Sequence, residues 1–465
     1  MDPVNDVLSL TADYAAQFLA TLDERPIRAD ASIEELREAL GGPLPQTGTD
    51  AMQVVADLIA AAEPGVVAIP SGRYFGFVIG GALPAALAAD WLTSTWDQNA
   101  GLVVGGPSAA VVEEVALEWL RDLLGLPDGV SAGFVTGCQM AHVTALAAAR
   151  HHVLASAGFD LARDGLQGAP RLRVLVGEER HVTVDRALRF LGIGTAQIDA
   201  VPVDGQGRMR ADKFVHALEA SSAPTIVCAQ AGNVNTGSFD PLVEIADAVA
   251  GTGAWLHVDG AFGLWAAASP RFQHLVAGAE RADSWATDGH KWLNVPYDSG
   301  IAFCAHPASH RAAMSVNASY LEQADPDAAR DQLDWNPEFS RRARGFPIHA
   351  AIRALGRDGI AAMVERCCDN AILFAELLSA EPRVEILNDV VLNQVLVRFG
   401  DDDAQTQATV KGVQEEGTCW LSGTVWQGRA AMRISVSNWQ TSTEDVERSA
   451  AAILEAAAVV SKSLR

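Results

Sequence analysis

Basic residues are scarce in this chain: its 465 residues include 34 Lys and Arg against 58 Asp and Glu, a formal net charge of -24. This surplus of negative charge disfavours contact with phosphate backbones and with anionic membrane surfaces. We therefore expect neither nucleic acid nor a membrane as a partner. The charge does not select a substrate, because the local field at a pocket can oppose the net charge of the molecule.

The chain has no CxxC pair and no long uninterrupted apolar run, and we expect no leader segment. Unpaired cysteines in apolar segments are typical of buried, reduced thiols in a cytoplasmic protein. The start, MDPVND, matches no signal peptide. Charge or proline interrupts the alanine-rich stretches, so we expect no transmembrane helix. The six cysteines are Cys138, Cys228, Cys304, Cys367, Cys368 and Cys419.

Strand-like apolar runs do recur between about residues 130 and 305, with helix-like segments between several of them. This alternation predicts an α/β fold with a mostly parallel sheet and helices on both faces. The strands are expected at residues 171–177, 225–230, 254–258, 284–287 and 299–305.

The flanking regions follow other patterns. Residues 13–22, 32–40 and 49–62 show the apolar spacing of amphipathic helices. From about residue 345, helices at 348–355, 363–378 and 405–415 and near the carboxyl terminus mix with strands at 384–387, 390–399, 418–426 and 430–436. We therefore divide the chain into an N-terminal helical segment (1–80), a large α/β domain (81–343) and a small C-terminal α+β domain (344–465).

The most informative stretch is residues 254–303. Asp259 ends an apolar run, and Lys291 follows it by 32 residues, directly after a second run. Ligands of α/β proteins bind at the carboxyl ends of strands, and a desolvated lysine amine can form a Schiff base with an aldehyde. A surface lysine is the ordinary alternative, but it poorly explains a lysine between His290 and Trp292.

The motif HVDGAFG, followed by DGHKW, resembles the group II pyridoxal-phosphate-dependent amino acid decarboxylases, and more distantly sphingosine phosphate lyase. The resemblance extends from about residue 70 to about residue 445. It implies a fold-type-I enzyme with a sheet of the seven-stranded type, and a homodimer that the N-terminal segment helps to form. The alternative for that segment is a helical cap on its own chain. The implied cofactor is pyridoxal 5'-phosphate, and the implied substrate is an L-amino acid.

The resemblance also implies roles for individual residues. Lys291 binds the cofactor aldehyde, Asp259 faces the ring nitrogen and keeps it protonated, and His181, supported by Thr183, stacks on the ring. A lone histidine at a helix start is otherwise a capping or core residue. The phosphate is placed at a helix start that offers free N–H groups, where this chain has Cys138-Gln139 in place of a small hydroxyl residue. The remaining cofactor contacts implied are Gly137, Asn233, Ala261 and His290, and no metal is expected.

Substrate contacts are less sharply indicated. Tyr74 and Phe75 match aromatic pocket positions of the family, although core packing explains them equally well. Residues 101–104, GLVV, lack the aromatics usual in aromatic decarboxylases, which counts against an aromatic substrate. Arg433 resembles an arginine that meets a substrate carboxylate in some relatives; a surface arginine on a strand is the alternative. Three further arginines look structural: Arg341, Arg342 and Arg344.

One departure from the family stands out. Between Tyr320 and Trp335 the family carries a mobile loop with a tyrosine that donates a proton after carbon dioxide leaves, and this chain has none there. Aligned on Trp335, Gln332 and Leu333 are nearest to its place. Another group, such as His181, Lys291, water or a partner residue, would have to give the proton. A retro-aldol lyase, an aminotransferase and a silent cofactor-binding protein therefore stay open beside a decarboxylase.

Overall fold

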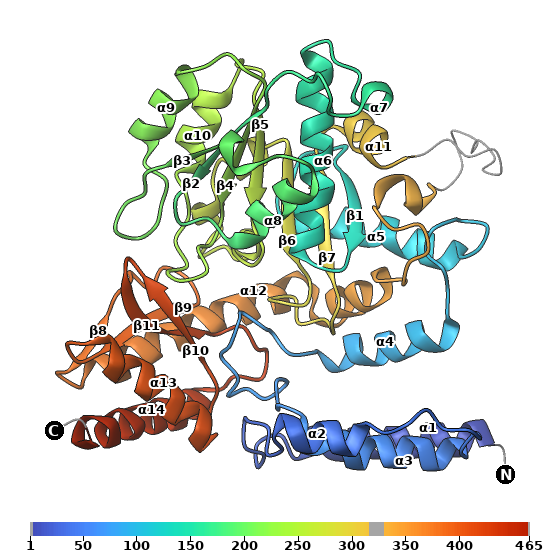
Figure 1. Cartoon of the computed structure of the whole chain (residues 1–465), viewed down its shortest axis with the longest axis vertical. Coiled ribbons are helices and arrows are strands. Elements are labelled where there is room, and N and C mark those ends of the chain that lie inside the picture. Colours follow the sequence, from blue (N-terminus) through green and yellow to red (C-terminus); the bar gives the residue numbers. More distant parts are fainter. Residues whose placement is uncertain (1–2, 316–329, 464–465) are drawn as a thin grey trace.

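The computed structural model describes residues 3–315 and 330–463 (Figure 1). Its largest sheet has seven strands in the order β1-β7-β6-β5-β4-β2-β3. Strand β7 runs antiparallel to β1 and β6, and the other neighbours are parallel. The mostly parallel sheet predicted from the sequence is thus confirmed. The strands are β1 (Ser131–Val135), β2 (Arg173–Gly177), β3 (Ile198–Val201), β4 (Thr225–Gln230), β5 (Trp255–Asp259), β6 (Ser284–Asp288) and β7 (Gly300–Cys304).

Alternate residues of the central strands enter two separate cores, one on each face of the sheet. In β2, Val174 and Val176 belong to one core and Leu175 to the other. In β4, Cys228 and Val227 are divided in the same way. Because side chains of a strand point alternately to opposite faces, strands covered on both sides read as continuous apolar runs.

Helices cover both faces of this sheet. Helix α6 (Cys138–Ser156) packs on β6 and β7, with α8 (Val182–Phe190) and α11 (Pro307–Met314) beside it. The opposite core includes residues of α9 (Ala211–Glu219), α10 (Leu242–Val249) and α5 (Pro107–Leu123). The sequence analysis did not predict α5, α9, α11, β1 or β3. The remaining short elements are α7 (Leu161–Asp164) and the 3₁₀ turns η1 (Glu63–Gly65), η2 (Thr195–Gln197), η3 (Gly263–Ala268), η4 (Gln273–Val276), η5 (Ala279–Arg281) and η6 (Gln332–Trp335).

The C-terminal region forms a second, antiparallel sheet in the order β10-β11-β9-β8. Its strands are β8 (Val384–Ile386), β9 (Gln394–Phe399), β10 (Ser422–Trp426) and β11 (Arg429–Ser435), and its helices are α13 (Asp403–Glu416) and α14 (Thr443–Ser463). Helix α12 (Gly345–Ser379) leads into it. The two helices expected here are both present within α12: a kink at Gly356, directly after the predicted end at Leu355, separates them, and its φ of 62° suits a residue without a side chain.

The N-terminal helices form a layer at the foot of the molecule, below α4 (Pro84–Trp96) (Figure 1). They are α1 (Pro3–Ala20), α2 (Ile33–Leu40) and α3 (Ala51–Ala62). Ser32 and Glu35 close a capping box at the start of α2. No residue of α2 or α3 is buried. The layer is held to the body through a small apolar cluster that includes Leu22, Ile27 and Tyr74.

Residues 70–81 join the two sheets. The N–H of Phe75 donates to Trp420 O at 2.7 Å, and its carbonyl accepts from Ser435 N at 3.0 Å. Gly80 lies so close to the loop after β6 that a Cβ there would stand 1.8 Å from Lys291 O. A side chain at position 80 would therefore displace the Lys291 loop. No helix among the described residues combines the length and the apolarity needed to cross a bilayer.

A buried ion pair fastens α5 to the segment after η6. Arg341 Nη2 lies 2.8 Å from Glu113 Oε1, and both side chains are fully buried. The same guanidinium donates to Ala100 O at 2.9 Å and to Phe134 O at 2.6 Å. Arg342 pairs with Asp90, and Arg344 with Asp298. All three arginines thus take part in contacts that hold the body together.

We expect Glu113→Gln to lower the free energy of unfolding by about 3–5 kcal/mol, because it leaves the Arg341 guanidinium buried without its anion. Urea-induced unfolding of the cofactor-free protein measures this. Glu118→Gln on the same helix removes an exposed partner of Arg121 and should leave the unfolding curve almost unchanged. Equal effects of the two substitutions would contradict the assignment.

Candidate functional site

A cavity of about 350 Å³ opens at the carboxyl edge of the large sheet, between the start of α6, the ends of β5 and β6, and β11. Its size suits a small-molecule site. Three of the twelve residues predicted for the site do not line it: Tyr74, Phe75 and Asn233. The other nine do: Gly137, Cys138, Gln139, His181, Asp259, Ala261, His290, Lys291 and Arg433.

Lys291 follows β6, and both its side chain and its loop are fixed by neighbouring residues. Its Nζ lies 3.1 Å from Asp288 Oδ2, and its side chain is 18% exposed. Burial alone would lower the pKa of this amine, but the nearby Asp288 and Asp259 raise it above its ordinary value. The side-chain amide of Asn294 fixes the loop by donating to Trp292 O and to Ser437 O, both at 3.0 Å. The cavity therefore holds a charged lysine in a defined place.

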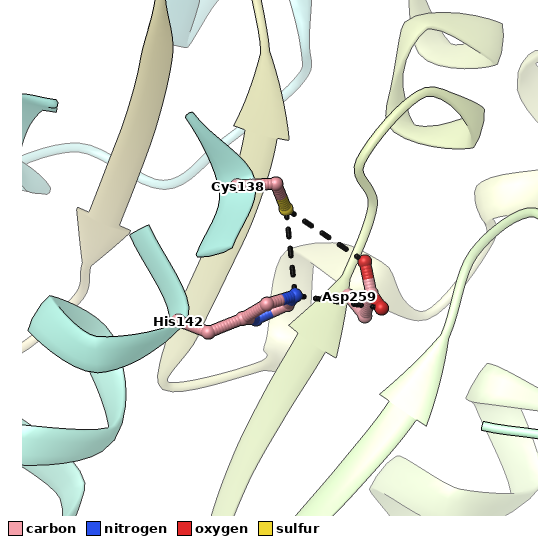
Figure 2. Close-up of side chains that lie close together, drawn as sticks. All are labelled: Cys138, His142 and Asp259. Carbon is pink, nitrogen blue, oxygen red and sulfur yellow. Dashed lines mark hydrogen bonds and ion pairs between the residues drawn. The ribbon is translucent and has the colours of Figure 1, made fainter. Parts of the chain in front are cut away.

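Asp259 ends β5 and is buried. Its Oδ1 accepts from Ala261 N at 3.2 Å and lies 3.9 Å from Cys138 Sγ, while its Oδ2 lies 3.5 Å from His142 Nε2 (Figure 2). Burial alone would raise the pKa of this carboxyl. His142, His181 and Lys291 outweigh it and hold the pKa well below the usual range. The site thus contains a buried, ionised carboxylate.

His181 is the N-cap of α8 and lines the cavity. Its Nδ1 accepts from Thr183 N at 3.4 Å and lies 2.7 Å from Thr183 Oγ1, the support expected from the sequence. Burial lowers the pKa of this imidazole. The ring is therefore neutral at neutral pH, and because Nδ1 accepts, its proton is on Nε2.

The start of α6 is the expected phosphate position. A Cβ on Gly137 would stand 3.0 Å from Cε1 of His290, so this close approach requires glycine. The amide of Gln139 donates to Thr183 O at 3.2 Å, and its buried Oε1 has no partner among the described residues. One backbone donor is already used, since Cys138 N donates to Asp288 Oδ1 at 2.5 Å.

This donor set fits pyridoxal phosphate. It offers an amine for the aldehyde, an ionised carboxylate for the ring nitrogen, and a glycine-lined helix start for the phosphate. The residues that would hold the phosphate are Gly137, Gln139 and His290, together with backbone N–H groups of α6. Ala261 lies beside Asp259, where a small side chain leaves room for a ring.

Arg433 reaches the cavity from β11 and is 9% exposed. Burial lowers the pKa of its guanidinium to about 10, so it stays charged at neutral pH. Nη1 lies 3.5 Å from Asn235 Oδ1, and Nε is buried without a partner. No carboxylate in the described part of the chain forms an ion pair with Arg433. A cation in this state can receive an anionic ligand.

Three predicted contacts lie elsewhere, and local packing explains each. Tyr74 is buried and stacks on Trp420 with ring centroids 5.1 Å apart, and Phe75 packs edge-on against Phe374. The alternative of core packing is therefore what the structure shows. Asn233 closes its own turn: Nδ2 donates to Glu179 O at 3.0 Å, and Oδ1 accepts from two backbone N–H groups of the loop.

The aromatic that does line the cavity is Phe77, the third of the run that starts at Tyr74. It is 53% exposed, and both Phe77 and Val78 have positive φ angles, 55° and 61°. Left-handed backbone is unfavourable for bulky and β-branched residues and often marks functional segments. Phe77 and Val78 form the centre of a turn that Ile79 N closes by donating to Gly76 O at 3.1 Å, and Phe77, not Tyr74, lines the cavity.

The expected proton-donor loop is only partly described, because residues 316–329 lie outside the described residues. Gln332 and Leu333 belong to η6 and are buried. Leu333 N donates to Gly101 O at 3.0 Å. These two residues are packed into the body of the structure.

Comparison with known proteins places this geometry in context. The model of the pyridoxal-dependent decarboxylase conserved domain matches residues 34–399. Tryptophan decarboxylase 1 of Oryza sativa subsp. japonica is 25% identical, covering 94% of this chain and 90% of that protein. Histidine decarboxylase of Mus musculus is 26% identical, covering 96% and 69%. The crystal structure of Oryza sativa TDC with PLP and tryptamine superposes with a TM-score of 0.92 at 23% identity, covering 99% and 98%.

We expect borohydride to fix pyridoxal phosphate covalently to Lys291 and to none of the three other lysines, Lys213, Lys411 and Lys462. The reason is that Lys291 is the lysine that lines the cavity. Peptide mapping by mass spectrometry after reduction locates the label. Lys291→Ala should bind the cofactor without covalent fixation, and a label found mainly on another lysine would refute the assignment.

Proposed function

Because the chain belongs to the pyridoxal-dependent decarboxylase family and is a carboxy-lyase that uses pyridoxal phosphate, we propose that Lys291, Asp259 and His181 carry its decarboxylation of an L-amino acid. The observation that carries this proposal is that all three side chains line one cavity, and that Lys291 is the lysine among the residues that line it.

The roles follow from the state of each side chain. When bound, the cofactor supplies an electron sink for the bond that breaks at the substrate Cα. Lys291 would hold the aldehyde end of the cofactor. Asp259, kept ionised by its neighbours, would hold a proton at the ring nitrogen. The neutral His181 would stack on the ring and has an N–H to offer at Nε2.

Arg433 is our candidate for the contact with a substrate carboxylate. Support comes from its buried charge, which no carboxylate of the described chain neutralises, and from the bidentate geometry that guanidinium and carboxylate share. Phe77, Val234 and Phe262 give the same cavity an apolar wall. Relatives named for tryptophan and for histidine show that the family accommodates different side chains.

A panel of amino acids tests the function: we expect released carbon dioxide with at least one substrate, none with Lys291→Ala, and full release with the control Lys213→Ala, which alters an exposed lysine. Arg433→Gln should raise KM most for those substrates whose carboxylate binds to Arg433 in the wild type. Carbonyl products formed without carbon dioxide would instead support the lyase or the aminotransferase alternative.

The same assay addresses the absent tyrosine. With no tyrosine between Tyr320 and Trp335, proton delivery after carbon dioxide leaves must come from elsewhere, and slow delivery leaves the carbanion open to side reactions. We expect carbonyl products beside the amine at a measurable fraction of turnover. Mass spectrometry in deuterated buffer separates the outcomes, and clean amine with one deuterium at Cα would show that another donor is efficient.

We further propose a cytoplasmic homodimer in which residues 1–80 form part of the subunit contact. Support comes from α2 and α3, which have no buried residue although Ile33, Val54 and Leu58 are apolar and exposed. Exposed apolar surface of this kind marks protein contacts. Six free, buried thiols suit a reducing compartment.

Sedimentation at micromolar concentration should therefore give a dimer. Replacing Ile33 and Leu58 by Asp should weaken it, because each substitution places a charge in an apolar contact. Asp57→Asn, next to Leu58 in α3, is the control and should leave the dimer intact. An active monomer at this concentration would contradict the proposal.

A further inference from the structure

A line of hydrogen-bonding side chains leads from Asp259 into the core. His142, one turn into α6, places Nε2 3.5 Å from Asp259 Oδ2 and Nδ1 2.9 Å from Nε2 of His257. The other nitrogen of His257 lies 2.9 Å from Ser284 Oγ. Trp255 Nε1 donates to the same oxygen at 2.8 Å. These four buried side chains, His142, His257, Ser284 and Trp255, are called the relay below.

The backbone explains why the relay is continuous. Trp255, His257 and Asp259 alternate along β5, so all three project to the face of the sheet that α6 covers. Ser284 is the partner of His257 in the register of β5 and β6. His142 lies four residues after Cys138, which puts both on one face of α6.

Trp255 favours one direction of the hydrogen bonds, because it occupies a lone pair of Ser284 Oγ and leaves the hydroxyl proton free. An indole N–H can only donate, so Ser284 Oγ accepts from Trp255 and has its own proton to give. The acceptor within reach is Nδ1 of His257. Burial, with a smaller contribution from His142, lowers the pKa of His257 to about 3, so this ring is neutral. Its proton is then on Nε2 and faces His142.

His142 completes the sequence. Its Nδ1 accepts from His257, which leaves the proton on Nε2, facing Asp259 Oδ2. The reverse direction would place the lone pair of His142 Nε2 against a carboxylate in a dry interior, where repulsion is strong. Every donor from Trp255 onward therefore points toward Asp259.

We propose that the relay is a positioning device: it fixes His142 in the tautomer that donates to Asp259, and so keeps this carboxylate ionised and oriented toward the ring nitrogen of the bound cofactor. The inference rests on the role proposed above for Asp259 and extends it to side chains that do not touch the cavity.

A metal site is the competing interpretation of part of this cluster. Ligand atoms of Cys138, His142 and Asp259 lie within 4.8 Å of one another (Figure 2). Two observations assign them to the carboxylate instead. Burial raises the pKa of the Cys138 thiol well above its ordinary value, so the S–H is kept and can donate to Asp259. The positive charge of Lys291 also lowers the pKa of this carboxyl and would repel a cation.

The test uses protein with ¹⁵N-labelled histidine, with and without pyridoxal phosphate. Long-range ¹H–¹⁵N spectra report the tautomer of each ring, and His142→Gln and His257→Gln assign the signals. Both rings should be neutral with the proton on Nε2. In Trp255→Phe the Ser284 hydroxyl is free to turn, so His257 should divide between its two tautomers. A proton on Nδ1 of His257 in the wild type, or tautomers unchanged in Trp255→Phe, would overturn the relay.

Cofactor binding gives a second readout. Ser284→Ala and Trp255→Phe should weaken pyridoxal phosphate binding roughly two- to tenfold, the effect of one neutral hydrogen bond, and should shift the absorption of the bound cofactor. His310→Gln is the matched control, since this buried histidine contacts Ser131 Oγ and Trp335 O outside the relay. Its cofactor affinity should equal that of the wild type.

Asp259→Asn tests the role of Asp259 separately from the role of the relay. If this variant binds the cofactor with unchanged affinity and absorption, the role proposed for Asp259 is wrong. If it differs from the wild type while Ser284→Ala and Trp255→Phe do not, the role of Asp259 holds and the relay is wrong. Thermal melting of each cofactor-free variant shows whether it is folded. If Ser284→Ala does not fold, Trp255→Phe alone tests the relay.

Discussion

The negative charge of Asp259, buried at the end of β5, is the constraint on which the site depends. An unpaired charge of this kind costs several kcal/mol inside a protein, so donors and positive charge must be brought to it from several elements. Helix α6 contributes His142 and Cys138, the start of α8 contributes His181, and the loop after β6 contributes Lys291. The same arrangement that compensates the charge also assembles the groups that the cofactor requires.

Much of the large sheet was predictable, because strands covered on both faces are continuous apolar runs. Strand β4 has the predicted bounds, Thr225–Gln230, β6 extends one residue beyond its predicted end, and β5 is shifted by one residue at both ends. The break expected after Leu355 is present at Gly356, whose backbone angles are not helical, but the second helix begins directly after it and not at Met363. Composition alone does not distinguish a kink from a loop.

Site residues that follow a strand could be predicted from the sequence. Site residues whose orientation depends on tertiary packing could not. Asp259 and Lys291 follow apolar runs, so their place at the sheet edge follows from the sequence. Nothing local to Tyr74 and Phe77 reveals which of them faces inward, because that depends on two residues with positive φ and on Trp420, far along the chain. The relay was missed although alternation in β5 signals it; what the sequence does not provide is the neighbouring Ser284.

Residues 70–81 have a consequence for the order in which the protein is made. This early segment hydrogen-bonds to Trp420 and Ser435 and packs on the Lys291 loop. Domains of nascent chains usually fold as they leave the ribosome, amino-terminal parts first. Here residues 70–81, which pack on the Lys291 loop, form hydrogen bonds to residues more than 300 positions downstream. The cofactor pocket is thus incomplete until Ser435 has been synthesised, and it is completed by a contact of very high sequence separation, a kind that forms slowly.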